Sequence, residues 1–430
     1  MKNIKNTLLV GAVALGLASS ASATTYLRIT GSTANGDATH TAILNVLTNT
    51  AGNSLTSYAY ETAALKGSKV AIFSGNISGI GAVIIKTKLT GSEAGIQTTV
   101  QGYNVAFLND TNLPVSGSTS GLTSAGETDV TAPGAALSDT FQSTSRFAAG
   151  ATVTQTNGAV TYTALTPATI TGSTNGIVGV VPFKFVATSD APFTNITTRL
   201  AQDLWSGGKV KLSGFTGNLA DNNKFVYATG RDIDSGTRLT CMLAIGFSAN
   251  GQVKQYQPST SANAQITSAA TANGATNNKL NAFPAGTINN VAVAIFNNGY
   301  NSGGNLVKAL AASATNYGGT AGVAAIVGYA GANDSDPQTT NSVNPLKELA
   351  FEGVYLGSAN GNYNTNAALI NGLYNVWGYE HLYFSAAVAL DANASAIGNA
   401  IATQLFNTDA VVRVSSMTVS RAGDGGAITY

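Results

Sequence analysis

Residues 225–240 read Phe-Val-Tyr-Ala-Thr-Gly-Arg-Asp-Ile-Asp-Ser-Gly-Thr-Arg-Leu-Thr. The alternation over 225–229 predicts a short strand, which ends at Gly230. Ser235, followed by Gly and Thr, then predicts the start of a helix that continues through the apolar residues up to Ile245. The chain therefore contains at least one unit in which a strand leads through a short turn into a helix.

The same stretch carries the parts of a site for an oxyanion. A helix start offers unpaired N–H groups and about half a positive charge. The Arg231 guanidinium can donate two parallel hydrogen bonds, and Ser235 and Thr237 add hydroxyl donors. Two structural alternatives remain open: Ser235 and Thr237 can simply cap the helix, and Arg231 can pair with Asp232 or Asp234 on the surface.

The composition narrows the class of protein. The chain has 430 residues, so two lobes are the default expectation. Hydrophobic residues make up 44%, which is enough for ordinary cores, whereas charged residues make up only 10%, against about 25% in typical soluble proteins. Such a weakly charged surface suits an exported protein, and it argues against a nucleic-acid partner, which would require a basic patch.

The N-terminal residues 1–23 predict a signal peptide. Lys2 and Lys5 are followed by an apolar run over 8–18 and by the small-residue sequence 21–23, so we expect cleavage after Ala23. The run is too short to span a bilayer. The expected location is therefore periplasmic or secreted.

Cysteine and histidine are scarce. Cys241 is the only cysteine, so no intrachain disulfide can form, and we expect a buried, inert thiol. His40 and His381 are the only histidines, which argues against a zinc site. We expect no metal and no cofactor.

Other strand patterns also end in small and hydroxyl residues. The pattern over 26–30 leads into Gly31-Ser32-Thr33, that over 83–89 into residues 90–95, and that over 135–137 into Ser138-Asp139. Strands that alternate with helices predict a largely parallel sheet, with ligands beyond the carboxyl ends of the strands. The small and hydroxyl residues follow those ends.

The remaining patterns complete a two-lobed plan. Residues 109–134 and 252–290 are expected to be surface loops, and Asn157-Gly158 predicts a hairpin within 153–162. Further elements are expected as strands at 176–186, 324–329, 374–385 and 411–419 and helices at 199–205 and 392–406. Residues 377–381, which include Glu380, are expected to pack at the lobe junction. The predicted domains are lobe 1 at 24–178, lobe 2 at 179–374 and a return to lobe 1 at 375–430.

In their order, these motifs make the chain resemble the periplasmic phosphate-binding protein of ABC-type phosphate importers. The matching segments span about residues 31–237 and are Gly31-Ser32-Thr33-Ala34, Thr90-Gly91-Ser92-Glu93-Ala94-Gly95, Ser138-Asp139 ahead of Val180-Val181-Pro182, Leu204-Trp205-Ser206-Gly207-Gly208-Lys209, and Arg231 with Ser235-Gly236-Thr237. The resemblance implies an α/β fold of the two-lobed, type II Venus-flytrap kind, with mixed sheets flanked by helices and a ligand cleft between the lobes.

The resemblance also implies a function and a set of ligand contacts. The protein would be a monomeric, non-enzymatic solute-binding protein that carries inorganic phosphate to an ABC permease of the inner membrane. The phosphate would be held by Thr33, the backbone of Ala34, Ser92, Asp139, Arg231, Ser235, Gly236 and Thr237. By the same resemblance, Asp139 would accept the proton of phosphate, which sulfate lacks.

The chain departs from the family pattern at two places. The acid that usually follows the Arg by two residues is replaced by Ile233, so that Asp232 or Asp234 would have to take its role. Residues 189–192, Ser-Asp-Ala-Pro, also resemble the family's Ser-Asp segment and leave Asp190 as an alternative to Asp139.

Three rival functions stay open at this point. A secreted phosphatase would need a nucleophile with a base, yet the sequence has no Gly-x-Ser-x-Gly elbow and no His-Glu-x-x-His motif. A secreted surface-layer protein on the same fold is compatible with the low charge and with the polar insertions. A third alternative keeps the binding function for an oxyanion other than phosphate.

Overall fold

A single mixed sheet runs through the whole molecule. The computed structural model describes residues 23–62, 64–114, 117–118, 126–340, 343–357, 362–409 and 411–430. The expected signal peptide therefore lies outside the described residues, apart from Ala23. Within these ranges, no helix combines the length and the apolar character that crossing a membrane would require.

Thirteen of the described strands form this sheet. In spatial order, eleven of them are β14 (Lys209–Lys211), β15 (Phe225–Ala228), β20 (Val323–Gly331), β12 (Ile177–Ala187), β23 (Trp377–Phe384), β8 (Ala135–Ser138), β1 (Thr25–Gly31), β4 (Gly81–Lys88), β3 (Val70–Ile77), β2 (Ser54–Tyr60) and β6 (Gly117–Ser118). The other two are β11 (Thr166–Pro167), which pairs with β23, and β21 (Lys347–Glu348), which pairs with β12.

Smaller two-stranded sheets decorate the main one. They are β9 (Thr152–Gln155) with β10 (Gly158–Thr161), β13 (Asn195–Ile196) with β22 (Ala350–Phe351), β16 (Tyr256–Ser259) with β17 (Lys279–Ala282), β18 (Gly286–Ile288) with β19 (Val291–Val293), and β5 (Val105–Phe107) with β7 (Asp129–Thr131). The pair β9–β10 confirms the hairpin expected at Asn157-Gly158.

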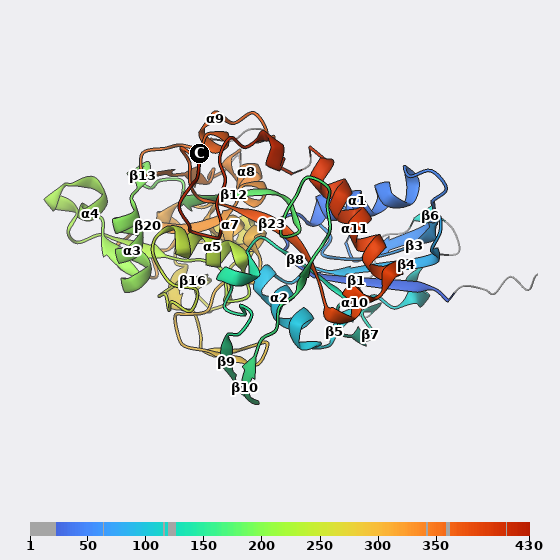
Figure 1. Ribbon diagram of the computed structural model, residues 1–430. Coiled ribbons are helices and arrows are strands. Elements are labelled where there is room, and N and C mark those ends of the chain that lie inside the picture. Colours follow the sequence, from blue (N-terminus) through green and yellow to red (C-terminus); the bar gives the residue numbers. More distant parts are fainter. Residues whose placement is uncertain are drawn as a thin grey trace, which may run out of the picture.

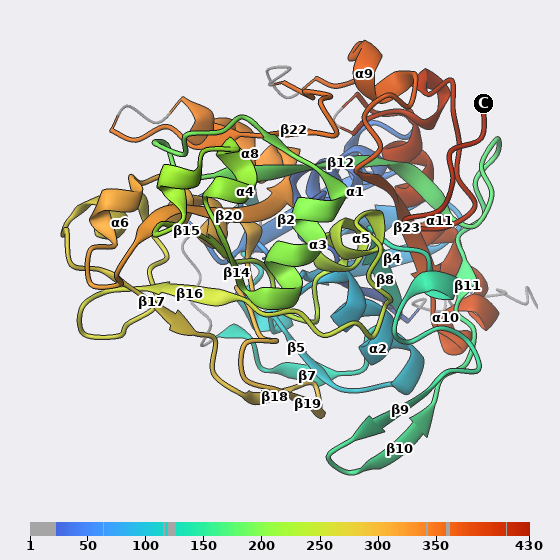
Figure 2. The same cartoon turned by 90° about the vertical axis from the view of Figure 1, so that its left-hand side faces the viewer.

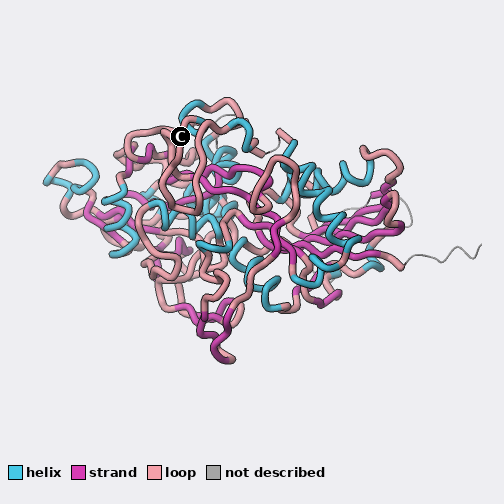
Figure 3. The backbone as a smooth tube through the Cα atoms, viewed as in Figure 1, coloured by secondary structure: helices cyan, strands magenta, loops and turns pink. Residues whose placement is uncertain are grey.

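Helices flank the sheet, as the mixed α/β prediction requires. They are α1 (Gly36–Thr48), α2 (Ser92–Gln101), α3 (Thr198–Gly207), α4 (Ser213–Thr216), α5 (Gly236–Ala244), α6 (Ala269–Asn273), α7 (Gly303–Leu310), α8 (Ala332–Thr339), α9 (Ala367–Ile370), α10 (Ala386–Leu390) and α11 (Ala392–Asn407). Short 3-10 turns are η1 (Asp110–Asn112), η3 (Gln142–Thr144), η4 (Leu219–Asp221), η5 (Ala314–Asn316) and η6 (Val414–Ser416). Figure 3 shows the strands running through the middle of the molecule, with helices and loops around them.

The strands β12 and β23 lie side by side at the centre and join two halves of the body (Figure 1). The first half contains β8, β1, β4, β3 and β2, and the second half contains β20, β15 and β14. Every residue of β12 is buried, which explains its largely apolar sequence, and the one charged residue, Lys184, pairs with Asp336 and Glu348.

The expectation of a largely parallel sheet is wrong. β1 pairs in parallel with β4 and β8, and β15 does so with β20, but β12 pairs antiparallel with both β20 and β23. The two central strands cross the body in opposite directions, so their own pairing has to be antiparallel. The short connections between β2, β3 and β4 add two further antiparallel pairs.

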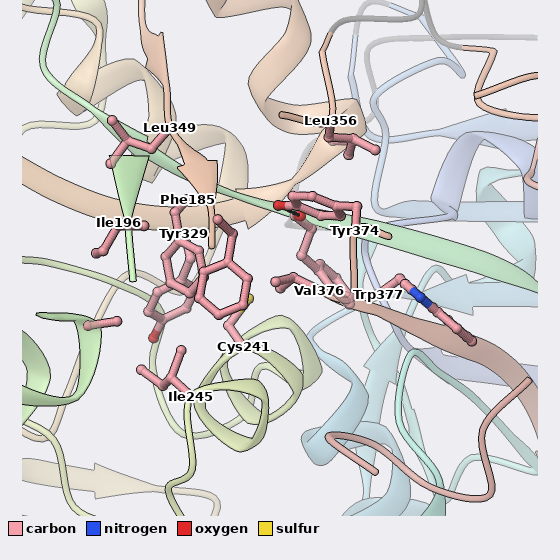
Figure 4. Packing of buried hydrophobic residues seen from close by; sticks show 14 of the residues in the cluster. Phe185, Ile196, Cys241, Ile245, Tyr329, Leu349, Leu356, Tyr374, Val376 and Trp377 are labelled. Atoms are coloured by element: carbon pink, nitrogen blue, oxygen red, sulfur yellow. Dashed lines mark hydrogen bonds between the residues drawn. The ribbon is translucent and has the colours of Figure 1, made fainter. Parts of the chain in front are cut away.

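Two main apolar clusters support the halves. One packs around β12 and contains Phe185, Trp205, Tyr374 and Trp377 (Figure 4). Cys241 is fully buried in this cluster, as expected. The other cluster lies under α1 and α11, in the first half.

Two local predictions fail. The strand expected at 411–419 is absent: Val412 makes an isolated bridge to Val180, and the next N–H, of Arg413, donates to Asn364 Oδ1 at 2.7 Å rather than to a strand. The two stretches expected as surface loops contain regular elements: 252–290 contributes β16, β17, β18 and α6, and 109–134 contributes η1, β6 and β7.

Candidate functional site

Three loops that follow β1, β4 and β8 meet at one place. The backbone N–H of Ser32 donates to Leu137 O at 2.8 Å, and that of Gly91 donates to Gly31 O at 2.8 Å. Gly95 packs closely on Gly31: a Cβ added to Gly95 would lie 2.6 Å from the Cα of Gly31. The starts of α1 and α2 are therefore held beside the end of β8, where Asp139 follows.

Asp139 is the centre of this place. Its carboxylate accepts hydrogen bonds from Ser92 Oγ and, at 3.3 Å, from Thr237 Oγ1. Its own N–H donates to Ser92 Oγ at 3.1 Å. All three residues are buried, with Asp139 only 2% exposed. One carboxylate thus joins the start of α2, from the first half, to the start of α5, from the second.

Gly236 allows this approach. A Cβ on Gly236 would lie 1.7 Å from Asp139 Oδ1 and 2.7 Å from Ser92 Cβ. Any side chain at this position would therefore collide with the carboxylate. The glycine that begins α5 is required by the close contact between the two halves.

Arg231 is buried and is held by carbonyl groups. Its Nε donates to Tyr300 O at 3.0 Å, and its Nη2 donates to Asn301 O at 3.2 Å. Tyr329 OH accepts from its backbone N–H at 3.2 Å. Arg231 is 2% exposed and forms no ion pair within the described residues, so the alternative of a surface pair with Asp232 or Asp234 is wrong.

The carboxyl and the guanidinium affect each other through charge. Burial raises the pKa of the Asp139 carboxyl, while the hydrogen bond from Ser92 and the charge of Arg231 act in the opposite direction. Arg231 and Asp334 both lie against Gly303, whose Cβ would be 3.3 Å from Arg231 Nη1 and 2.0 Å from Asp334 Oδ2. Asp334, from α8, is thus a neighbouring negative charge that the sequence analysis missed.

The other predicted ligands lie around this centre in different roles. Ser235 Oγ accepts from Arg238 N at 3.2 Å and so caps α5, as one of the structural alternatives proposed. Thr33 and Ala34 line a cleft next to the centre, and the Ala34 N–H donates to Ser32 Oγ at 3.3 Å. The structure therefore brings Ser92, Asp139, Gly236 and Thr237 into contact, with Thr33 and Ala34 on an adjoining wall.

Glu380 is a buried carboxyl that was expected only to pack. Its Oε2 accepts from Ser32 Oγ and from Asn35 Nδ2, each at 3.0 Å, and its Oε1 has no hydrogen-bond partner among the described residues. His381 pairs with Ser138, so the antiparallel register places Glu380 opposite Asp139. Burial raises the pKa of Glu380 well above its ordinary value, and the charge of Asp139 adds to this.

The three alternative aspartates make other contacts. Asp190 accepts from Ser313 Oγ and, at 2.8 Å, from Ala314 N at the start of η5. Asp232 accepts from the N–H of Asp234 at 3.2 Å. Neither Asp232 nor Asp234 hydrogen-bonds Arg231, so the carbonyl groups of residues 300 and 301 position that guanidinium instead.

A set of hydrogen bonds latches the two halves together. The N–H of Glu93 donates to Asp234 O at 3.0 Å across the two halves, whereas the bond from Asn289 Nδ2 to Asp234 Oδ2, at 2.6 Å, lies within the second half. Gln97 Nε2 donates to Asn289 O at 2.8 Å, and Thr156 N donates to Asn290 O at 2.7 Å. The last bond joins the β9–β10 and β18–β19 hairpins, both seen at the lower edge of Figure 2.

A cleft of about 800 Å³ is lined by Thr33, Ala34 and Asp334, although not by Ser92, Asp139, Gly236 or Thr237. Its walls come from the start of α1 and the loop before β3 on one side, and from the starts of α7 and α8 on the other. Within the described part of the chain, no group of three or more His, Cys, Asp and Glu side chains could hold a metal ion.

Comparison with known proteins gives structural matches alone. No profile of a known family and no curated protein matches the sequence. A phosphate-bound structure from Clostridium perfringens, assigned to the phosphate ABC transporter substrate-binding proteins, aligns with 90% of this chain and 99% of its own, at 11% identity and a TM-score of 0.40. An ABC-type phosphate transport receptor from Vibrio cholerae aligns over 89% and 97%, at 12% identity and a TM-score of 0.37. A phosphate-binding protein from Stenotrophomonas maltophilia aligns over 87% and 83%, at 14% identity and a TM-score of 0.32.

Proposed function

We propose that this protein is an extracytoplasmic solute-binding protein that holds inorganic phosphate between its two halves and delivers it to an ABC permease. The contacts would come from the side chains or backbone of Thr33, Ala34, Ser92, Asp139, Arg231, Ser235, Gly236 and Thr237. Residues 24–178 with 375–430 would form one lobe and 179–374 the other. A cleaved signal peptide at 1–23 would place the chain in the periplasm or outside the cell.

The observation that carries this proposal is a set of unpaired donors on the same loops and helix starts as one buried acceptor, Asp139. Arg231 Nη1 and the first-turn N–H groups of Ser92, Gly236 and Thr237 have no hydrogen-bond partner within the described residues. The starts of α2 and α5 add partial positive charge at the same place. Donors of this kind suit a tetrahedral anion.

Asp139 would supply selectivity among such anions. A phosphate ion near neutral pH still carries a proton, which an ionised carboxylate can accept, whereas sulfate presents only acceptors. An unmatched charged group in a buried site costs upwards of about 1–3 kcal/mol, so a site that requires this bond can reject sulfate strongly. For phosphate to bind, Ser92 and Thr237 would turn their hydroxyl groups from Asp139 to the ligand.

Titration calorimetry with phosphate and with sulfate tests the proposal. We expect phosphate to bind one-to-one, with no detectable heat from sulfate. Asp139→Asn should reduce the ratio of phosphate affinity to sulfate affinity by at least about tenfold. Arg231→Ala should reduce the affinity for phosphate by about a hundredfold or more. Asp190→Asn is the matched control because it changes a family-like aspartate far from the donors. Equal effects of the two Asp→Asn changes would contradict the assignment.

A further inference from the structure

The cleft beside Asp139 is lined by more cations than a single phosphate ion would need. Lys66 and Lys69 come from the loop before β3, and Lys308 comes from α7 on the opposite wall. Thr33 and Ala34, which we place in the phosphate site, also line the cleft. The lysine side chains therefore share a cleft with two of the residues proposed for the phosphate site.

Lys69 is the lysine that links this cleft to Arg231. It is half-buried, and its side chain has no hydrogen bond or ion pair to the described residues, although its carbonyl accepts from Leu89 N at 2.9 Å. Burial lowers the pKa of Lys69, and the nearby charge of Arg231 lowers it further. Two cations are thus held close enough to repel each other, and an anion between them would relieve that repulsion.

The carboxylates of the cleft balance only part of this positive charge. Asp37 Oδ1 accepts from the Gly67 N–H at 2.6 Å, so this carboxylate already bonds a backbone group on the same side of the cleft. Asp334 faces Arg231, Lys69 and Lys308, and it is the main counter-charge. His40 adds no positive charge at neutral pH, because burial lowers its pKa to about 4.

The cleft is larger than a single orthophosphate ion would fill. A volume of about 800 Å³ lies in the range of about 300–1,000 Å³ that proteins use for drug-sized ligands. Neither α1 nor α7, which begin at this cleft, has a side-chain cap, so both starts leave N–H donors available. The cations and donors together suit a second anionic group.

We propose that the cleft is a second anion subsite, which takes the outer phosphoryl group of a condensed phosphate whose first phosphoryl group occupies the Asp139–Arg231 site. This inference rests on the proposed function. Pyrophosphate is the smallest ligand of this kind. Lys69 would contact the bridge between the two groups, and Lys308 would contact the outer one.

Calorimetry with three ligands tests the subsite: orthophosphate, pyrophosphate and glycerol phosphate, which has an uncharged extension. We expect the wild type to bind pyrophosphate at least tenfold more tightly than glycerol phosphate. The double variant Lys69→Gln with Lys308→Gln should bind pyrophosphate at least tenfold more weakly than the wild type. Its affinity for orthophosphate should fall by less than about threefold. Lys211→Gln, an exposed change on β14 away from the cleft, is the matched control and should alter neither.

Each result decides one of the two proposals. Orthophosphate binding without pyrophosphate binding overturns the subsite and leaves the proposed function intact. The subsite is also overturned if the wild type binds pyrophosphate and glycerol phosphate with equal affinity. The same holds if the double variant loses affinity equally for all three ligands. Failure of every phosphate compound to bind overturns both. A melting curve for each variant shows whether it is folded.

Discussion

The contact between Gly236 and Asp139 makes a sharp test of the site. In Gly236→Ala the new Cβ would lie 1.7 Å from Asp139 Oδ1, although Cβ contacts essentially never fall below 3.0 Å. The carboxylate must therefore retreat by about 1.3 Å, or α5 must move by a similar distance. Thr237 Oγ1 is already 3.3 Å from Asp139, so this displacement breaks that bond and disturbs the bond from Ser92.

The magnitude follows from these losses. Overpacking costs about 1–3 kcal/mol, and each hydrogen bond to a charged group contributes about 1.5–3 kcal/mol. Alanine recovers up to about 1 kcal/mol in a helix relative to glycine. We therefore expect Gly236→Ala to lower the free energy of unfolding by about 2–4 kcal/mol. Because the acceptor is displaced, phosphate affinity should fall by about a hundredfold.

Urea unfolding and phosphate calorimetry measure the two effects. Gly207→Ala is the matched control: it also adds a Cβ to a helical glycine, but nothing lies within 4 Å of that position. The control should be neutral or slightly more stable than the wild type, with unchanged affinity. If Gly236→Ala behaves like Gly207→Ala in both measurements, then Gly236 does not maintain the geometry of Asp139 and the reasoning fails.

Three further predictions concern other residues. Burial raises the pKa of Asp424 from 3.8 to about 7, so its contribution to stability is complete below pH 3.8 and is lost as the pH rises from there through about 7; Asp424→Asn should remove the part of this loss that falls between pH 5 and pH 8, about 3 kcal/mol, from urea titrations at those two pH values. Gln97→Ala removes the bond that joins Gln97, in the first half, to the Asn289 carbonyl, in the second, so stopped-flow release of phosphate should accelerate several-fold, whereas an unchanged rate would show that this latch does not limit opening. Burial raises the pKa of Cys241 well above its ordinary value, so a thiol reagent should label it only after unfolding.

The sequence predicted the local units of the fold well. The strand before Arg231 and the helix after Ser235 appear as β15 and α5, and the buried run at 176–186 appears as β12. These elements were readable because hydrophobic periodicity and helix start signals act within a few residues. Whether neighbouring strands pair in parallel or antiparallel could not be predicted, because this depends on how the two central strands cross between the halves.

The environment of the site depended on contacts between distant segments. Arg231 is held by carbonyl groups of Tyr300 and Asn301, about seventy residues away in the sequence. Backbone oxygens carry no side-chain signal, so no pattern could have indicated them. Glu380 was readable as a strand residue, but its position opposite Asp139 follows from the pairing of β23 with β8, which a single sequence does not specify.

The pairing of Asp139 with Glu380 has a consequence for the proposed ligand. Two buried carboxylates on neighbouring strands cannot both be charged without a large cost, and Glu380 has no cation partner within the described residues. Burial and the charge of Asp139 raise the pKa of Glu380 well above its ordinary value, so we expect Glu380 to stay protonated beside an ionised Asp139. A neutral Glu380 leaves Asp139 as the single charge of the pair. The positive charge of Arg231 and of the helix starts can then balance both that charge and an incoming anion, which is the condition for a carboxylate to accept the ligand's proton instead of repelling the ligand.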